Sequence, residues 1–142
     1  MIISRTRTSA IVVKNQRLLT FRAIDPSNGK EYLFLPGGEI EPTETAPEAA
    51  ERECLEETGY EIKVDELTAI DREYFFEWKG QTFDCLTIFY RGELQKPFAH
   101  PVNDAEYNKG VVWLEVEKIP EVFAYSSEIK SDIIEILSKP QN

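Results

Sequence analysis

The sequence has little of several features that would indicate particular classes of protein. It contains two cysteines, Cys54 and Cys85, and their spacing matches no metal-binding or redox motif, so we expect two reduced thiols in or near the core. No apolar run approaches the roughly 20 residues of a membrane-spanning helix. The N-terminus also lacks the long apolar segment of a signal peptide. We therefore expect no membrane partner and, by default, a cytoplasmic location.

Positive charge is also scarce. The chain has 16 Lys and Arg against 26 Asp and Glu, which gives a formal net charge of −10. Such a surface repels nucleic-acid polymers, whose binding depends on neutralising phosphates, so we expect no partner of this kind. Small phosphorylated ligands would be repelled as well, unless a cation intervenes. The length of 142 residues, 42% hydrophobic and 30% charged, predicts one soluble globular domain over residues 1–142.

Hydrophobic patterning predicts an α/β sandwich with a mixed β-sheet and helices on its faces. The expected strands lie at 9–24, as a hairpin turning at 14–16, at 32–38, at 66–78 and 81–94, as a hairpin turning at 79–80, and at 111–116. The strand at 32–38 is expected to end in a tight bend at Gly37-Gly38. Helices are expected at about 46–58 and at 126–139. The long polar loop at 95–110 is of a kind that is often functional.

The boundaries of the first helix follow from its capping residues. Thr45 followed by Glu48 fits a capping box, Pro47 is tolerated in the first turn, and Gly59 fits the C-terminal stop. The C-terminal helix has a candidate cap at Ser126 or Ser127.

The first helix carries an unusual group of carboxylates. Glu53, Glu56 and Glu57 stand at i, i+3 and i+4 and so share one face, on which no Lys or Arg lies. A solvated acidic face is one interpretation. A site for a hard divalent cation such as Mg²⁺, which prefers oxygen ligands, is the other. Arg52 beside this face is either an ordinary surface arginine or a bidentate clamp that joins Glu44 in the preceding loop to the helix.

Taken together, these residues resemble the Nudix box, the signature of the Nudix hydrolase superfamily. Every fixed residue of the box is present at the right spacing: Gly38, Glu44, Arg52, Glu53, Glu56, Glu57 and Gly59. Two positions that usually hold aliphatic residues carry Cys54 and Tyr60 instead, and both are apolar enough to pack.

The resemblance implies a Nudix-type α/β/α sandwich and a hydrolase that depends on Mg²⁺ or Mn²⁺. Water would attack the pyrophosphate link of a nucleoside diphosphate joined to another group. The resemblance assigns metal binding to Glu53, Glu56 and Glu57 with the carbonyl of Gly38, and support of the loop and helix to Glu44 and Arg52. Metal ions would let a strongly anionic protein hold an anionic substrate. Glu57, or a carboxylate of the long loop, would take the proton of the attacking water.

Some candidates lie outside the box. Of the acids in and next to the long loop, Glu93, Asp104 and Glu106, we favour Glu106 as an additional ligand or base. The resemblance also implies that Arg22, at the end of a strand, contacts phosphate, as an arginine at about this place does in related enzymes. Arg5 and Arg7 are expected to be exposed sheet residues, with a place in the same cleft as the alternative. Four aromatic residues are expected to be mainly core, with a base-stacking platform as the alternative: Tyr32, Tyr74, Phe76 and Trp78.

The function expected on these grounds is hydrolysis of a small nucleotide, either a nucleotide sugar such as ADP-ribose or a nucleoside triphosphate. The alternative is a non-catalytic Nudix-fold module that binds a nucleotide or another phosphorylated ligand. Because no carboxylate of the box is lost, the enzyme is favoured. A homodimer is compatible with the sequence.

Overall fold

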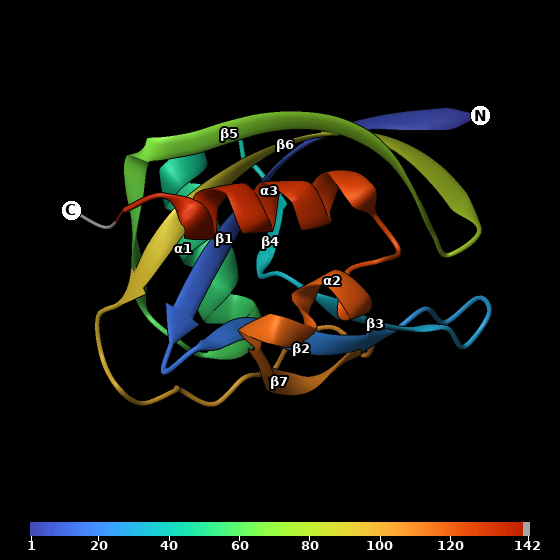
Figure 1. The fold of residues 1–142 in the computed structure, drawn as a ribbon. Coiled ribbons are helices and arrows are strands. Elements are labelled where there is room, and N and C mark those ends of the chain that lie inside the picture. The colour runs from blue at the N-terminus through green and yellow to red at the C-terminus, as the bar shows by residue number, and fades with distance from the viewer. Residues whose placement is uncertain (141–142) are drawn as a thin grey trace.

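The computed structural model describes residues 1–140 as a mixed α/β fold (Figure 1). In chain order, the elements are β1 (Ile2–Lys14), β2 (Arg17–Ile24), β3 (Glu31–Phe34), β4 (Gly37–Glu39), α1 (Ala46–Thr58), β5 (Ile62–Trp78), β6 (Gln81–Leu94), β7 (Asn108–Glu115), the 3₁₀ helix η1 (Val116–Lys118), α2 (Ile119–Val122) and α3 (Ser127–Ser138). Within these residues no helix combines the length and the apolar character needed to cross a membrane.

The seven strands form one mixed sheet in the order β3-β2-β1-β6-β5, with β4 paired to β1 and β7 to β2. β1 runs parallel to β6, whereas every other pair is antiparallel. Two residue pairs, Val13↔Leu18 and Lys14↔Arg17, are all that join β1 to β2. The sheet therefore divides into one part built on β1, β4, β5 and β6 and another built on β2, β3 and β7.

Helices cover both faces of the first part of the sheet. Figure 1 shows α1 behind β1 and β6 and α3 in front of them. Side chains alternate between the two faces along each strand. Ile11 of β1 therefore packs in one core with Ile133 of α3, whereas its neighbour Val12 packs in the other with Ala50 of α1. The predicted sandwich with a mixed sheet is confirmed.

The two cysteines lie on opposite faces of the sheet. Cys54 belongs to the core beneath α1 and Cys85 to the core beneath α3. Both are buried and free, as the sequence predicted.

The capping residues place α1 as predicted. The backbone N–H of Glu48 donates to Oγ1 of Thr45 at 3.3 Å, and the N–H of Thr45 donates to the Glu48 carboxylate at 2.9 Å. Gly59 ends the helix with φ of 81°, in the left-handed region that glycine tolerates best. The caps thus determine where α1 begins and ends, and so which direction each of its glutamates points.

The prediction for Gly37 and Gly38 was wrong. They do not form a bend but belong to β4, which pairs with β1 through Ser9↔Gly37 and Thr8↔Gly38. A Cβ on Gly37 would lie 2.2 Å from the carbonyl oxygen of Thr8. Glycine is therefore required for the close approach of two strands.

Other boundaries differ from the expectation in small ways. The first strand begins at Ile2 and β5 at Ile62, both earlier than predicted, and β7 begins at Asn108 inside the expected loop. β5 keeps pairing with β6 across a register shift between Asp65 and Ile70, which interrupts the alternating pattern. The short elements η1 and α2 were not predicted, because three or four residues carry no helical periodicity.

Candidate active site

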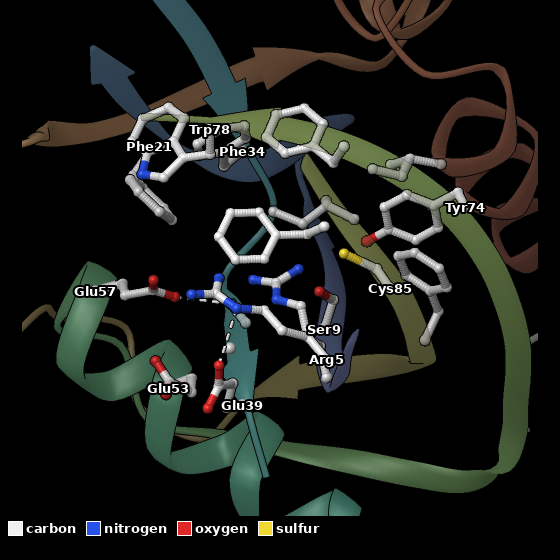
Figure 2. A pocket seen from close by; sticks show the side chains of 18 of the residues that line it. Arg5, Ser9, Phe21, Phe34, Glu39, Glu53, Glu57, Tyr74, Trp78 and Cys85 are labelled. Carbon is white, nitrogen blue, oxygen red and sulfur yellow. Dashed lines mark hydrogen bonds and ion pairs between the residues drawn. The ribbon is translucent and has the colours of Figure 1, made fainter. Parts of the chain in front are cut away.

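A pocket of about 350 Å³ is lined by β1, β4, β5 and β6, by Glu53 and Glu57 of α1, and by Phe34 of β3 and Ile129 of α3. Figure 2 shows Glu53 and Glu57 of α1 at one side of it, with Phe34 and Trp78 across from them. The pocket therefore has a carboxylate side and an aromatic side, and each has its own chemistry.

Glu57 is the most buried carboxylate of the pocket, with 5% of the residue exposed. The backbone N–H of Gly37 donates to its Oε1 at 2.7 Å. Burial raises the pKa of Glu57 well above its usual value, and the nearby charge of Glu53 raises it further. This bond from β4 fixes the orientation of the carboxylate toward the pocket.

Glu53 lies against β4 because Gly38 has no side chain. A Cβ at Gly38 would come within 2.6 Å of the carboxylate carbon of Glu53. Burial raises the pKa of Glu53, while the guanidinium of Arg52, 3.0 Å away, acts in the opposite direction. The missing side chain of Gly38 thus leaves the space on β4 that the Glu53 carboxylate of α1 occupies.

Arg52 forms the predicted clamp. Its Nε and Nη2 donate to the two oxygens of Glu44 at 2.9 and 2.6 Å, and Nη2 also donates to the carbonyl of Glu39 at 3.2 Å. This fork lowers the pKa of Glu44 to about 2. Nη1 contacts Glu53 and Glu56 at 3.0 and 3.1 Å. The interpretation of Arg52 as an unpaired surface residue is therefore wrong.

The donors suit a hard divalent cation, although they are not gathered around one point. Among residues 1–140 no three His, Cys, Asp or Glu side chains are grouped so that they would hold a metal ion as they stand. Glu56 is exposed and contacts Arg52, whereas the charge of Glu53 lies close enough to Glu57 to raise the pKa of Glu57. Carboxylate oxygens are the ligands that Mg²⁺ prefers, and a cation would relieve this repulsion. The residues present fit such an ion by their chemistry.

Three candidates outside the box, Arg22, Asp104 and Glu106, do not line the pocket. Arg22 pairs with the carboxylate of Glu31 and is not among the residues that line the pocket, so its contact with substrate stays a prediction. Glu106 is exposed and does not line the pocket either. Asp104 accepts a hydrogen bond from Nδ2 of Asn108 at 3.1 Å.

Arg5 and Arg7 differ from Arg22 in their surroundings, because they line the pocket and Arg22 does not. The expectation that Arg5 and Arg7 are exposed sheet residues was wrong, because both are half-buried and line the pocket. They lie on the face of β1 that also carries the pocket, and alternation alone does not reveal which face of a strand is covered.

The aromatic side of the pocket is larger than predicted. Tyr74, Phe76 and Trp78 line it from β5 and also belong to the core or pack against it, as expected, whereas Tyr32 does not line it. A base-stacking role for these rings stays a prediction. Phe34, whose ring centroid is 5.4 Å from that of Trp78, and Tyr125 after α2 also line the pocket and were not predicted. These residues meet only through the fold, so no spacing in the sequence could have linked them.

Two further contacts join the start of β7 and the loop before it to the end of α1. Nδ2 of Asn108 donates to the backbone carbonyl of Glu57 at 3.0 Å, and the N–H of His100 donates to the carbonyl of Gly59 at 2.7 Å. A Cβ on Gly59 would lie 2.1 Å from the carbonyl oxygen of His100. Sequence reasoning missed the role of Asn108, which sits in an otherwise ordinary polar stretch.

Comparisons with known proteins agree with this geometry. A family model described as NUDIX domain matches residues 4–134. A MutT-like protein of Streptomyces ambofaciens is 32% identical over 114 residues, which are 80% of this chain and 65% of that protein, so the chain spans slightly less than two thirds of that relative's length.

Solved structures show the same fold at low identity. A NUDIX hydrolase from Nitrosomonas europaea superposes with a TM-score of 0.72 at 21% identity, over 95% of this chain and 88% of that one. An Ap4A hydrolase of C. elegans superposes with a TM-score of 0.67 at 19% identity, over 96% of both chains. At these identities the likeness concerns the fold.

Proposed function

This chain belongs to the NUDIX domain family, and we propose that it is a hydrolase that cleaves the pyrophosphate link of a small nucleoside diphosphate derivative. A nucleotide sugar such as ADP-ribose and a nucleoside triphosphate are the two candidate substrates. The observation that carries the proposal is the pocket itself, in which Glu53 and Glu57 face a group of aromatic rings. The carboxylate side suits a metal-bound pyrophosphate, and the aromatic side suits a nucleobase.

Divalent metal is part of the proposal. Glu53, Glu56, Glu57 and the carbonyl of Gly38 would hold Mg²⁺ or Mn²⁺. Such an ion, when bound, neutralises charge on a pyrophosphate and lowers the pKa of a coordinated water. The exposed position of Glu56 requires its side chain to leave Arg52 when it takes part.

Glu57 is the residue that we propose as proton acceptor. The N–H of Gly37 holds its Oε1, which leaves Oε2 as the atom that faces the attacking water. Burial raises the pKa of this carboxylate, and a raised pKa makes it a stronger base. The proton of the water would therefore pass to Oε2 as the bond from the water oxygen to phosphorus forms and the bond from that phosphorus to the bridging oxygen breaks, which releases the other phosphate group with the bridging oxygen.

Arg52 and Glu44 would act through position. Their fork joins the loop after β4 to α1, and Arg52 also contacts Glu53. Loss of either side chain would loosen the carboxylates without removing them. The contacts of Arg22 and Glu106 with substrate, a homodimer, the extent of one domain over residues 1–142 and a cytoplasmic location stay predictions.

The experiment that tests the function is a substrate screen with Mg²⁺. Nucleoside triphosphates, dinucleoside polyphosphates, ADP-ribose and other nucleotide sugars would be incubated with the protein, and products would be separated by ion-exchange chromatography. Two phosphorylated products from one member of the panel are expected. Tight binding without turnover of any member would instead support the non-catalytic module.

A further inference from the structure

One cation of the pocket has no acidic partner among residues 1–140. Arg7 of β1 is half-buried and lines the pocket, and its charge interacts with Glu57 on one side and with Tyr74 and Cys85 on the other. Yet among residues 1–140 its guanidinium makes no ion pair within 4.0 Å.

The pairing of β1 with β4 explains why Arg7 has no ion pair. Glu39 of β4 is paired with Arg7 across the two strands, so its carboxylate would be the natural partner. That carboxylate instead accepts from Nε of Arg5 at 3.0 Å. Arg5 in turn lies over the ring of Phe83, 3.9 Å from its centroid, which holds it in place.

The remaining carboxylates of the pocket have other donors. Glu53 is paired with Arg52 at 3.0 Å, and Oε1 of Glu57 is held by the backbone N–H of Gly37 at 2.7 Å. The guanidinium of Arg7 therefore lines the pocket without a carboxylate partner, and the Tyr74 hydroxyl is the neighbouring group to which it is hydrogen-bonded. A half-buried charge without a partner costs free energy unless something else satisfies it.

The geometry indicates what would satisfy it. An arginine presents several N–H donors in a planar fork, which matches the oxygens of a phosphate. Arg7 lies between the carboxylate side of the pocket and its aromatic side. In a nucleotide, the group between the pyrophosphate and the base is the phosphate attached to the nucleoside.

We propose that Arg7 binds the phosphate attached to the nucleoside of the substrate and thereby makes the pocket select nucleotides over nucleosides. The inference rests on the proposed function for the kind of ligand that enters the pocket. It gives Arg7, rather than Arg22, which is paired with Glu31, the contact with that phosphate.

Binding without turnover tests this role. Isothermal titration calorimetry in Mg²⁺ buffer would measure the affinities of AMP, GMP, CMP and UMP and of the four matching nucleosides. The variants are Arg7→Gln, which removes the charge, and Arg7→Lys, which keeps the charge and loses the fork. Arg17→Gln is the matched control, since Arg17 is exposed at the start of β2 and does not line this pocket.

We expect Arg7→Gln to weaken binding of the best monophosphate about tenfold or more, as the loss of a charge-assisted hydrogen bond does. Its affinity for the nucleoside should stay within about twofold of the wild type, because the base does not contact Arg7. The monophosphate affinity of Arg7→Lys should lie between those of the wild type and Arg7→Gln, and the affinity of Arg17→Gln should match that of the wild type.

Two results would overturn the proposal. One is an unchanged ratio of nucleoside to monophosphate affinity in Arg7→Gln, and the other is a wild type that binds none of the four monophosphates. Should Arg7→Gln fail to fold, as its thermal melt would show, the same ratio measured in Arg7→Lys decides. These results are independent of the substrate screen, since a protein that hydrolyses nothing can still bind a monophosphate through Arg7.

Discussion

At the scale of single residues, the site depends on how two carboxylates of one helix meet the glycines of a short strand. Gly37 supplies an N–H to Glu57, and Gly38 leaves the space that the Glu53 carboxylate fills. Neither glycine acts through the freedom of its own backbone. Both act because a side chain at their position would collide with β1 or with α1.

Replacement of Glu57 tests the proposed proton acceptor. Glu57→Gln should lower kcat by at least about 10²-fold, because general-base contributions have this size. The amide oxygen of glutamine can still accept from Gly37, and a neutral side chain avoids the cost of burying a charge. The variant should therefore be at least as stable as the wild type in metal-free buffer at pH 8, as measured by thermal unfolding.

A matched control for this variant is Glu73→Gln. Glu73 lies on β5 with its side chain exposed and has no ion pair within the described residues, so kcat should be unchanged. A Glu57→Gln protein that keeps more than about a tenth of wild-type kcat would contradict the assignment.

At the scale of elements, two arginine clamps hold the helices to the rest of the fold. Arg52 ties α1 to the loop that follows β4, and Arg72 of β5 ties α3 to the sheet through Asp132. The first clamp lies at the site. The second lies away from the pocket and so reports on stability alone.

The clamp at α1 should give the protein a distinct response to acid. The pKa of Glu44 is lowered to about 2 in the folded protein, from an ordinary 4.5. Its ion pair with Arg52 therefore contributes to stability fully above about pH 4.5, and the contribution is lost as the pH falls toward 2.

Urea denaturation of the wild type and of Glu44→Gln at several values between pH 5 and pH 2 measures this effect. The difference in the free energy of unfolding between the two should be largest at pH 5 and should shrink toward zero at the acid end. A difference that stays constant over this window would show that the ion pair does not stabilise the fold.

The clamp at α3 should behave as a buried pair. Nε and Nη2 of Arg72 donate to the two oxygens of Asp132 at 3.0 and 2.7 Å, and the Asp132 side chain is 0% exposed. Arg72→Met leaves this carboxylate buried without its partner and should cost about 3 kcal/mol of unfolding free energy.

A double-mutant cycle separates the pair from its surroundings. Arg72→Met combined with Asp132→Leu removes both charges and should be more stable than Arg72→Met alone. Equal stability of the single and the double variant in chemical denaturation would mean that the two side chains are not coupled.

At the scale of the whole molecule, the net charge of −10 makes divalent ions a test of the site. An ion that binds only the folded protein, at ten times its dissociation constant, adds about 1.4 kcal/mol, or roughly 5 °C in Tm for a chain of this size. We expect Mg²⁺ or Mn²⁺ to raise Tm by about this much beyond NaCl of equal ionic strength. The double variant Glu53→Gln, Glu57→Gln should lose the extra rise, and EDTA should reverse it in the wild type.

The whole molecule also shows what the sequence could and could not predict. Local chemistry determines the limits of α1 and the turn at Asn15-Gln16, and these were predicted. The Nudix box is local as well, since it is one continuous segment that runs from Gly38 of β4 through the next loop and α1. The aromatic side of the pocket joins β3, β5 and the segment after α2, and the side of β1 on which Arg7 lies depends on which face is covered. Both features depend on how distant segments pack in the fold, so they could not be predicted from the sequence pattern alone.

The two buried cysteines lie on opposite sides of β1 and β6, with exposed fractions of 0% for Cys54 and 4% for Cys85. Because each thiol reacts only when its own layer opens, a maleimide or disulfide reagent would time the opening of the two layers separately in a single sample. A nucleotide in the pocket, which Cys85 lines, should slow labelling of that thiol far more than labelling of Cys54. The labelling rates of the two thiols would thus report on the two faces of the sheet separately, and the rate of Cys85 would also report whether the pocket is occupied.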